Sequence, residues 1–127
     1  MFQFPVLLGD IGGTNVRLAV LPSPAAAAIL LPRTHTSDHA GAVQAIRATL
    51  HGQNCPQPRS ALLAVAARVD GSAVPLTNAA WTIDAAEIGA AFGLSSVVLV
   101  NDYVPVAVSL ATIRTLDRLA CRLRHRR

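Results

Sequence analysis

Hydrophobic and polar positions in the first part of the chain follow the pattern of β-strands. Val6-Leu7-Leu8 is a short apolar run, and residues 16–20 alternate well enough to form a second strand. The stretch between them, residues 9–15, is rich in glycine, so the pattern predicts a β-hairpin. The adjacent residues Gly12 and Gly13 permit the positive φ that tight turns use.

The pattern after the hairpin predicts a third strand and then an alternation of strands and helices. Residues 25–31, ended by Pro32, are interpreted as a strand, and residues 39–50 have helical spacing behind a cap at Ser37 or Asp38. The remaining predicted elements are a loop over 51–60, a buried strand over 61–67, a short strand over 72–76, a helix over 84–92, a strand over 97–100 and a helix from Tyr103 to Leu123. This order predicts an α/β fold with a mixed sheet and helices on its faces.

Two local features refine the predicted segment around residue 84. Asp84 and Glu87 have the spacing of a capping box in its acidic variant, and Gly93 follows the last apolar turn of the helix. Trp81 is the only tryptophan, and we interpret it as a packing residue whose indole N–H has a partner.

The composition indicates one soluble domain with enough apolar residues to build a core. The chain has 127 residues, 52% of them hydrophobic. No apolar run approaches the ~20 residues that span a bilayer, and the N-terminus lacks the marks of a signal peptide. We therefore expect a cytoplasmic protein with no membrane partner. Cys55 and Cys121 lack metal-type spacing, which fits a reducing compartment.

The positive charge of the chain is concentrated at its C-terminal end. The net charge is +4, every one of the eleven basic residues is arginine, and six of them lie in Arg114–Arg127. Without that tail, five arginines face six acidic residues, so the rest of the chain is nearly neutral. Leu116, Leu119 and Leu123 predict an amphipathic helix in the tail, so we expect no nucleic-acid partner.

The predicted hairpin carries residues that suit a phosphate group. Gly12 and Gly13 have no side chains to keep an anion from the backbone N–H groups, and Thr14 and Asn15 add a hydroxyl and an amide. Asp10 is well placed to hold a hydrated magnesium ion. The motif alone leaves a second interpretation open, in which the hairpin is plain and its Asp and Asn serve turn geometry.

A second polar pair follows the predicted strand at 97–100. Open α/β sheets bind ligands beyond the C-terminal ends of their strands, which is where Asn101 and Asp102 stand. An aspartate there can accept a proton from an alcohol while its asparagine neighbour orients that alcohol. The alternative is that Asp102 only caps the following helix, and one side chain can do both.

In their order and spacing these motifs resemble the bacterial-type glucokinase family, which belongs to the actin-like sugar kinases. The resemblance covers about residues 5–110. The matching stretches are residues 8–19 (LGDIGGTNVRLA), 69–71 (VDG), 76–81 (LTNAAW) and 99–103 (LVNDY). As a set they are strongly specific, although none of them would be so alone.

The resemblance implies a fold, a reaction and a site. The fold would be one lobe of the ribonuclease H-like, actin-like ATPase type, and the reaction would be ATP-dependent phosphorylation of glucose at its 6-hydroxyl. Asp10 would act through Mg²⁺, Asn101 and Asp102 would bind glucose with Asp102 as the base, and Asn78 would lie near the sugar. The residues that would contact ATP are Gly9, Asp10, Ile11, Gly12, Gly13 and Thr14.

Some residues depart from the family pattern. Arg68 stands where a proline or a small uncharged residue is usual, Tyr103 replaces a phenylalanine, and Val104-Pro105 replaces helix-favouring residues. We divide the chain into a glucokinase-like lobe over 1–110 and an unrelated, Arg-rich helical tail over 111–127.

Length is the larger departure, because members of the family are about twice as long or longer. We therefore interpret the chain as a truncated N-terminal lobe that is inactive alone and exposes a surface for association where the second lobe would lie. The alternative is a non-catalytic half that needs a separately encoded second lobe.

Overall fold

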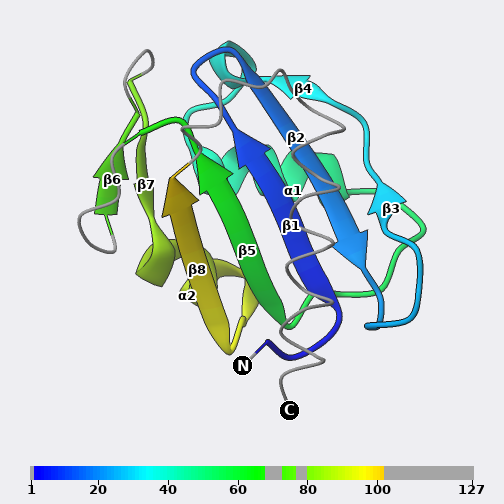
Figure 1. The fold of residues 1–127 in the computed structure, drawn as a ribbon. Coiled ribbons are helices and arrows are strands. Elements are labelled where there is room, and N and C mark those ends of the chain that lie inside the picture. Colours follow the sequence, from blue (N-terminus) through cyan, green and yellow to red (C-terminus); the bar gives the residue numbers. More distant parts are fainter. Residues whose placement is uncertain (1, 68–72, 77–79, 102–127) are drawn as a thin grey trace.

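One mixed β-sheet organises the part of the chain that the structure, a computed structural model, describes: residues 2–67, 73–76 and 80–101 (Figure 1). Its strands are β1 (Val6–Ile11), β2 (Asn15–Leu21), β3 (Ile29–Leu30), β4 (Thr34–His35), β5 (Ser60–Val65) and β8 (Ser96–Asn101). A second sheet pairs β6 (Ala73–Pro75) with β7 (Thr82–Asp84). The helices are the 3₁₀ helix η1 (Thr36–Asp38), α1 (Ala42–Leu50) and α2 (Ala85–Phe92). None of these helices is long and apolar enough to cross a membrane.

The order of strands in the main sheet is β3-β2-β1-β5-β8, and β4 pairs with the other end of β2. β1 runs antiparallel to β2 and parallel to β5, and β5 runs parallel to β8. In this register Ile11, Val65 and Asn101 stand in one row across the three parallel strands. The C-terminal ends of β1, β5 and β8 therefore meet at the same edge of the sheet (Figure 1). The expected mixed sheet is confirmed.

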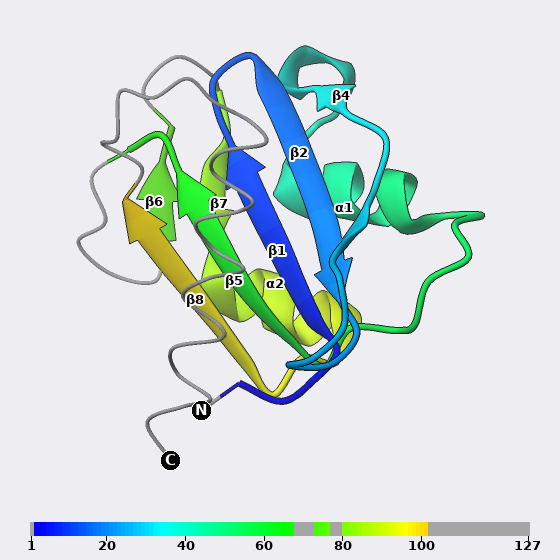
Figure 2. The same ribbon diagram turned by 45° about the vertical axis from the view of Figure 1, so that its right-hand side comes forward.

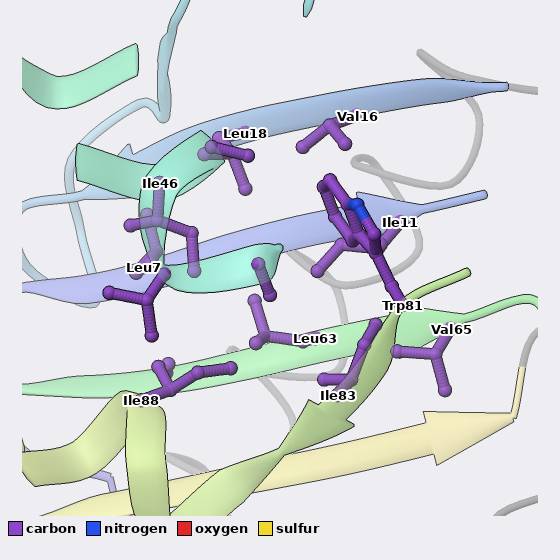
Figure 3. Close-up of a cluster of buried hydrophobic side chains, with 14 of the residues drawn as sticks. Leu7, Ile11, Val16, Leu18, Ile46, Leu63, Val65, Trp81, Ile83 and Ile88 are labelled. Carbon is purple, nitrogen blue, oxygen red and sulfur yellow. The ribbon is translucent and has the colours of Figure 1, made fainter. Parts of the chain in front are cut away.

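Both α-helices pack against the same face of the sheet (Figures 1 and 2). Figure 3 shows the core between them, where Ile46 of α1 and Ile88 of α2 lie over Leu7 and Leu63. A smaller cluster lies on the opposite face, and Phe2 and Phe4 pack against it. Every residue of β5 is buried, which confirms the expectation of a central strand covered on both faces.

Gly9 has a packing role in the middle of β1. A Cβ built on it would lie 2.6 Å from Cδ2 of Leu63 and 2.9 Å from Cδ2 of Leu18, its partners in the two neighbouring strands. Real Cβ atoms do not approach other atoms so closely, so these two leucines occupy the space that a side chain would need. The absence of a side chain at Gly9 allows Leu18 and Leu63 to pack closely over β1.

The start of α1 differs from the prediction. The helix begins at Ala42 behind Gly41, which makes no side-chain cap, and neither Ser37 nor Asp38 caps it. The chain before it is extended at His39 (φ −135°, ψ 152°), where the His39 carbonyl accepts a hydrogen bond from the Trp81 indole at 3.1 Å. This contact comes from a distant segment, so helical spacing alone could not reveal it.

The contacts of Trp81 and the two ends of α2 match the predictions from the sequence. Trp81 is buried, and its indole N–H has the expected partner. The Asp84 carboxylate accepts hydrogen bonds from the backbone N–H groups of Ala86 at 2.9 Å and Glu87 at 3.4 Å, and Gly93 ends the helix in the left-handed conformation (φ 64°). Both ends of this helix were predictable because capping depends on neighbouring residues alone.

The short strands were predicted poorly. The strand predicted over 25–31 contracts to β3, and β4 and β7 were not predicted at all. Strands of two or three residues carry too few positions to show an alternating pattern, and the partner strand decides where they form. The helix predicted from Tyr103 to Leu123 lies outside the described residues.

Replacing Gly9 with alanine should destabilise the protein by about 1–3 kcal/mol, because the added methyl group overpacks the core between Leu18 and Leu63. Gly89→Ala is the matched control: its Cβ would lie 3.6 Å from the nearest atom, Cγ2 of Val97, in ordinary contact. Because alanine favours helix, that variant should be stabilised by up to ~1 kcal/mol. Urea unfolding followed by circular dichroism measures both, and equal stability of Gly9→Ala and the parent chain would contradict the packing role.

Replacing Asp84 with alanine should cost about 0.5–2 kcal/mol, because two N–H groups of α2 lose their acceptor. Asp38→Ala makes the same chemical change at an exposed residue that caps no helix, so its effect should stay within about 0.5 kcal/mol. Thermal unfolding of the two variants compares them directly, and a loss of similar size in both would contradict this assignment of the caps.

Candidate functional site

A three-residue loop, residues 12–14, joins β1 to β2 at the edge where the parallel strands end. The Gly12 N–H donates to the Asn15 carbonyl at 2.9 Å and closes the hairpin. Among the described glycines, positive φ occurs at Gly52 (75°) and Gly93 (64°), so the loop does not use the freedom that its glycines permit. This corrects the sequence-based view of the turn: hydrogen bonds, rather than left-handed glycines, hold its shape.

The 3₁₀ helix η1 holds this loop from the side. The Thr36 hydroxyl donates to the Gly12 carbonyl at 2.7 Å, and the Thr36 N–H donates to the Thr14 carbonyl at 2.8 Å. Only 1% of Thr36 is exposed. Sequence reasoning did not select this residue, because no local pattern connects it with a loop more than twenty positions earlier.

The loop leaves hydrogen-bond donors for an anion. Within the described part of the chain, the N–H groups of Gly13 and Thr14 have no partner, and the Thr14 side chain is exposed. Neighbouring backbone N–H groups of this kind form anion-binding concavities, so this donor set fits a phosphate group. The Gly12 N–H is already used within the loop.

Three of the residues expected to contact ATP, Gly9, Asp10 and Ile11, lie in β1 rather than in the loop, and two of these are fully buried. Gly9 is buried between Leu18 and Leu63, and Ile11 is buried in the core beneath α1 and α2. The Ile11 carbonyl accepts a hydrogen bond from the Ala66 N–H at 3.0 Å. Ile11 packs into the core and Gly9 leaves room for two leucines, so within the motif these two residues serve packing and the loop is the more exposed part.

Asp10 is the carboxylate at this edge, one residue before the end of β1. It stands opposite Arg17 of β2 and is only partly buried. Because side chains alternate along a strand, Asp10 lies on the face opposite Ile11. The described residues hold no cluster of three or more metal-binding side chains. Magnesium often uses a single carboxylate together with phosphate oxygens, so a carboxylate such as Asp10 beside a phosphate-binding loop suits that ion.

Asn101 ends β8 in the same row as Ile11 and Val65. Its side-chain oxygen Oδ1 is buried and accepts no hydrogen bond within the described part of the chain. A buried acceptor without a donor costs free energy, so this atom is suited to a ligand's hydroxyl group. Asn78 and Asp102, the other expected sugar-binding residues, lie outside the described residues.

Comparison with known proteins agrees with these motifs. The family model named Glucokinase matches residues 7–125, which extends past the point at residue 110 where the motif resemblance ends. The glucokinase of Sinorhizobium fredii is 40% identical over 110 residues, which are 87% of this chain and 32% of that protein. The glucokinase of Brucella abortus is 38% identical over 112 residues, which are 88% of this chain and 33% of that protein.

A solved structure has the same fold over most of the chain. The crystal structure of glucokinase from an Antarctic psychrotroph matches with a TM-score of 0.66 and 28% identity, covering 85% of this chain and 37% of that one. The chain thus spans about a third of the length of the curated relatives it matches. Because the family model matches nearly all of these residues, the chain belongs to the glucokinase family.

Proposed function

We propose that these residues form the part of an ATP-dependent glucose kinase that holds the phosphates of ATP and the reacting 6-hydroxyl of glucose. One observation carries the proposal: the register of β1, β5 and β8 brings the hairpin loop and Asn101 to the same edge of the sheet. Phosphoryl transfer needs its donor and acceptor in line, so the two groups must be held side by side. The fold would be a lobe of the actin-like ATPase type.

The phosphates would bind to the hairpin loop. The N–H groups of Gly13 and Thr14 and the Thr14 hydroxyl would donate to phosphate oxygens, as oriented backbone donors do at other anion sites. Asp10 would hold Mg²⁺, which when bound neutralises charge on the phosphate oxygens. Gly9 and Ile11 would act indirectly, by packing β1 so that the loop after it is held in place, since both residues are buried in the sheet.

The sugar would bind at the end of β8. Asn101 Oδ1 would accept a hydrogen bond from a glucose hydroxyl, which would satisfy an otherwise unpaired buried oxygen. Asp102, the next residue, would accept the proton of the 6-hydroxyl as that oxygen attacks the terminal phosphorus of ATP, and the bond from this phosphorus to the bridging oxygen would break to release ADP. Asn78 would lie near the sugar.

Turnover would need more of the protein than these residues. The chain covers about a third of each curated relative, and half of a cleft cannot hold both substrates in line. The same observation favours a second candidate function, in which the chain serves as a non-catalytic half that works only with a separate second lobe.

Titrating the ¹⁵N-labelled chain with Mg·ATP should shift the amide resonances of Gly13 and Thr14 most. The Gly12 resonance should move less, because its N–H already donates to Asn15. Thr14→Val removes one hydroxyl donor and should weaken binding roughly two- to tenfold. Thr82→Val is the matched control at an exposed residue of β7. Shifts centred elsewhere, or equal weakening in the two variants, would place the phosphate site outside the hairpin.

The purified chain should show no glucose-dependent release of ADP. Positioning of the two substrates supplies most of the rate, and we expect that these residues alone cannot position both. A coupled assay measures this release, with Asp102→Asn alongside and circular dichroism to show that both proteins are folded. Turnover by the parent chain but not by the variant would support Asp102 as the base and contradict the need for a second lobe. Equal turnover by both would exclude Asp102 as the base.

A further inference from the structure

We infer that Thr36 is a positioning residue for the phosphate-binding loop, a role that rests on the proposed function of that loop. Thr36 touches neither the reacting atoms nor the sugar segment in this assignment. It acts on the backbone of residues 12–14 through two hydrogen bonds, one from its hydroxyl and one from its N–H.

The hydroxyl of Thr36 determines where one phosphate donor points. The carbonyl of Gly12 and the N–H of Gly13 belong to the same planar peptide group, and in a trans peptide they point in opposite directions. The hydroxyl holds the Gly12 carbonyl at 2.7 Å on the η1 side of the loop. The Gly13 N–H is therefore directed away from η1.

The second hydrogen bond fixes the other end of the loop. The Thr36 N–H donates to the Thr14 carbonyl at 2.8 Å, while the Gly12 N–H closes the hairpin onto Asn15. The loop backbone is thus held at both ends before any ligand arrives. Donors that are already oriented lose less conformational freedom on binding, which strengthens binding without a new contact.

Thr36 can hold the loop because its own segment is anchored on both sides. On one side β4 pairs with β2, with His35 opposite Asn15. On the other side the His39 carbonyl accepts the Trp81 indole N–H, and the His39 N–H donates to the Thr36 carbonyl at 3.3 Å. Trp81 lies at the end of the core beside Ile11 (Figure 3). The segment that carries Thr36 is therefore held on both sides by contacts with β2 and Trp81.

The variants Thr36→Val and Thr36→Ser distinguish the effect of the hydroxyl group from the effect of the side chain's shape. Valine fills the same volume but cannot donate to Gly12, whereas serine keeps the donor. Thr49→Val is the matched control, because the Thr49 hydroxyl also donates to a backbone carbonyl, that of Ala45 at 2.8 Å, and Thr49 is also buried. That bond lies within α1, away from the loop.

Two measurements on each variant test the inference. The first is hydrogen exchange of the Gly12 N–H without ligand, which reports how often the loop opens. The second is the dissociation constant for Mg·ATP. Thr36→Val should speed the exchange and weaken binding about tenfold, Thr36→Ser should restore both to within about twofold, and Thr49→Val should change neither.

The outcomes distinguish the inference from the proposed function. If the parent chain binds Mg·ATP and Thr36→Val binds it equally well, the positioning role is overturned while the proposed function stands. If Thr36→Ser fails to restore binding, the hydroxyl is not the group that matters and the role is overturned too. If the parent chain does not bind Mg·ATP at its hairpin, the proposed phosphate site fails. In that case, exchange of the Gly12 N–H that is faster in Thr36→Val, but not in the other two variants, still supports the role of Thr36 in fixing the loop backbone. Unchanged exchange in Thr36→Val overturns that role.

Discussion

The parallel alignment of β1, β5 and β8 is the constraint on which the rest of the structure depends. Because the three strands share one register, their C-terminal ends lie at one edge, which brings the hairpin loop after β1 and Asn101 at the end of β8 to that edge. Within this alignment β5 is buried on both faces, with α1 and α2 on one face and the smaller apolar cluster on the other. The candidate site is thus a consequence of how the core packs.

Glycine serves two separate purposes within one short motif. Gly9 makes room for two leucine side chains and so allows β1 to sit at the centre of the sheet. Gly12 and Gly13 lie beyond the strand, where the absence of side chains leaves the loop backbone open to a ligand. A motif that looks like a single phosphate-binding unit in the sequence therefore combines a packing residue with a binding loop.

The loop is held by residues from outside its own motif. Thr36 of η1 contacts the loop, and the indole of Trp81 donates a hydrogen bond to His39, directly after η1. Trp81 itself lies in a later stretch that resembles the family. Stretches that are far apart in the sequence thus support one another in the fold. These contacts connect two of the stretches that resemble glucokinases, residues 8–19 and 76–81, through the segment that carries Thr36 and His39.

Several features could be predicted from the sequence because they depend on neighbouring residues. The hairpin, the buried strand β5, the caps of α2 and the strand β8 all follow from local periodicity or local capping. The family was also identified from motifs in the sequence, and the family model that matches residues 7–125 confirms it. The roles of Asn78 and Asp102 stay predictions.

Other features were decided only by tertiary structure. The start of α1 was predicted three residues too early, because the Trp81 indole holds the His39 carbonyl in extended backbone. The purpose of Gly9 depends on leucines in two other strands, and the role of Thr36 depends on a loop more than twenty residues away. The sequence by itself determined the longer strands and the helix α2, together with the motifs that they carry, since periodicity and capping are local. Tertiary packing alone decided which backbone groups meet, because those hydrogen bonds join residues whose distance along the chain leaves no pattern to read.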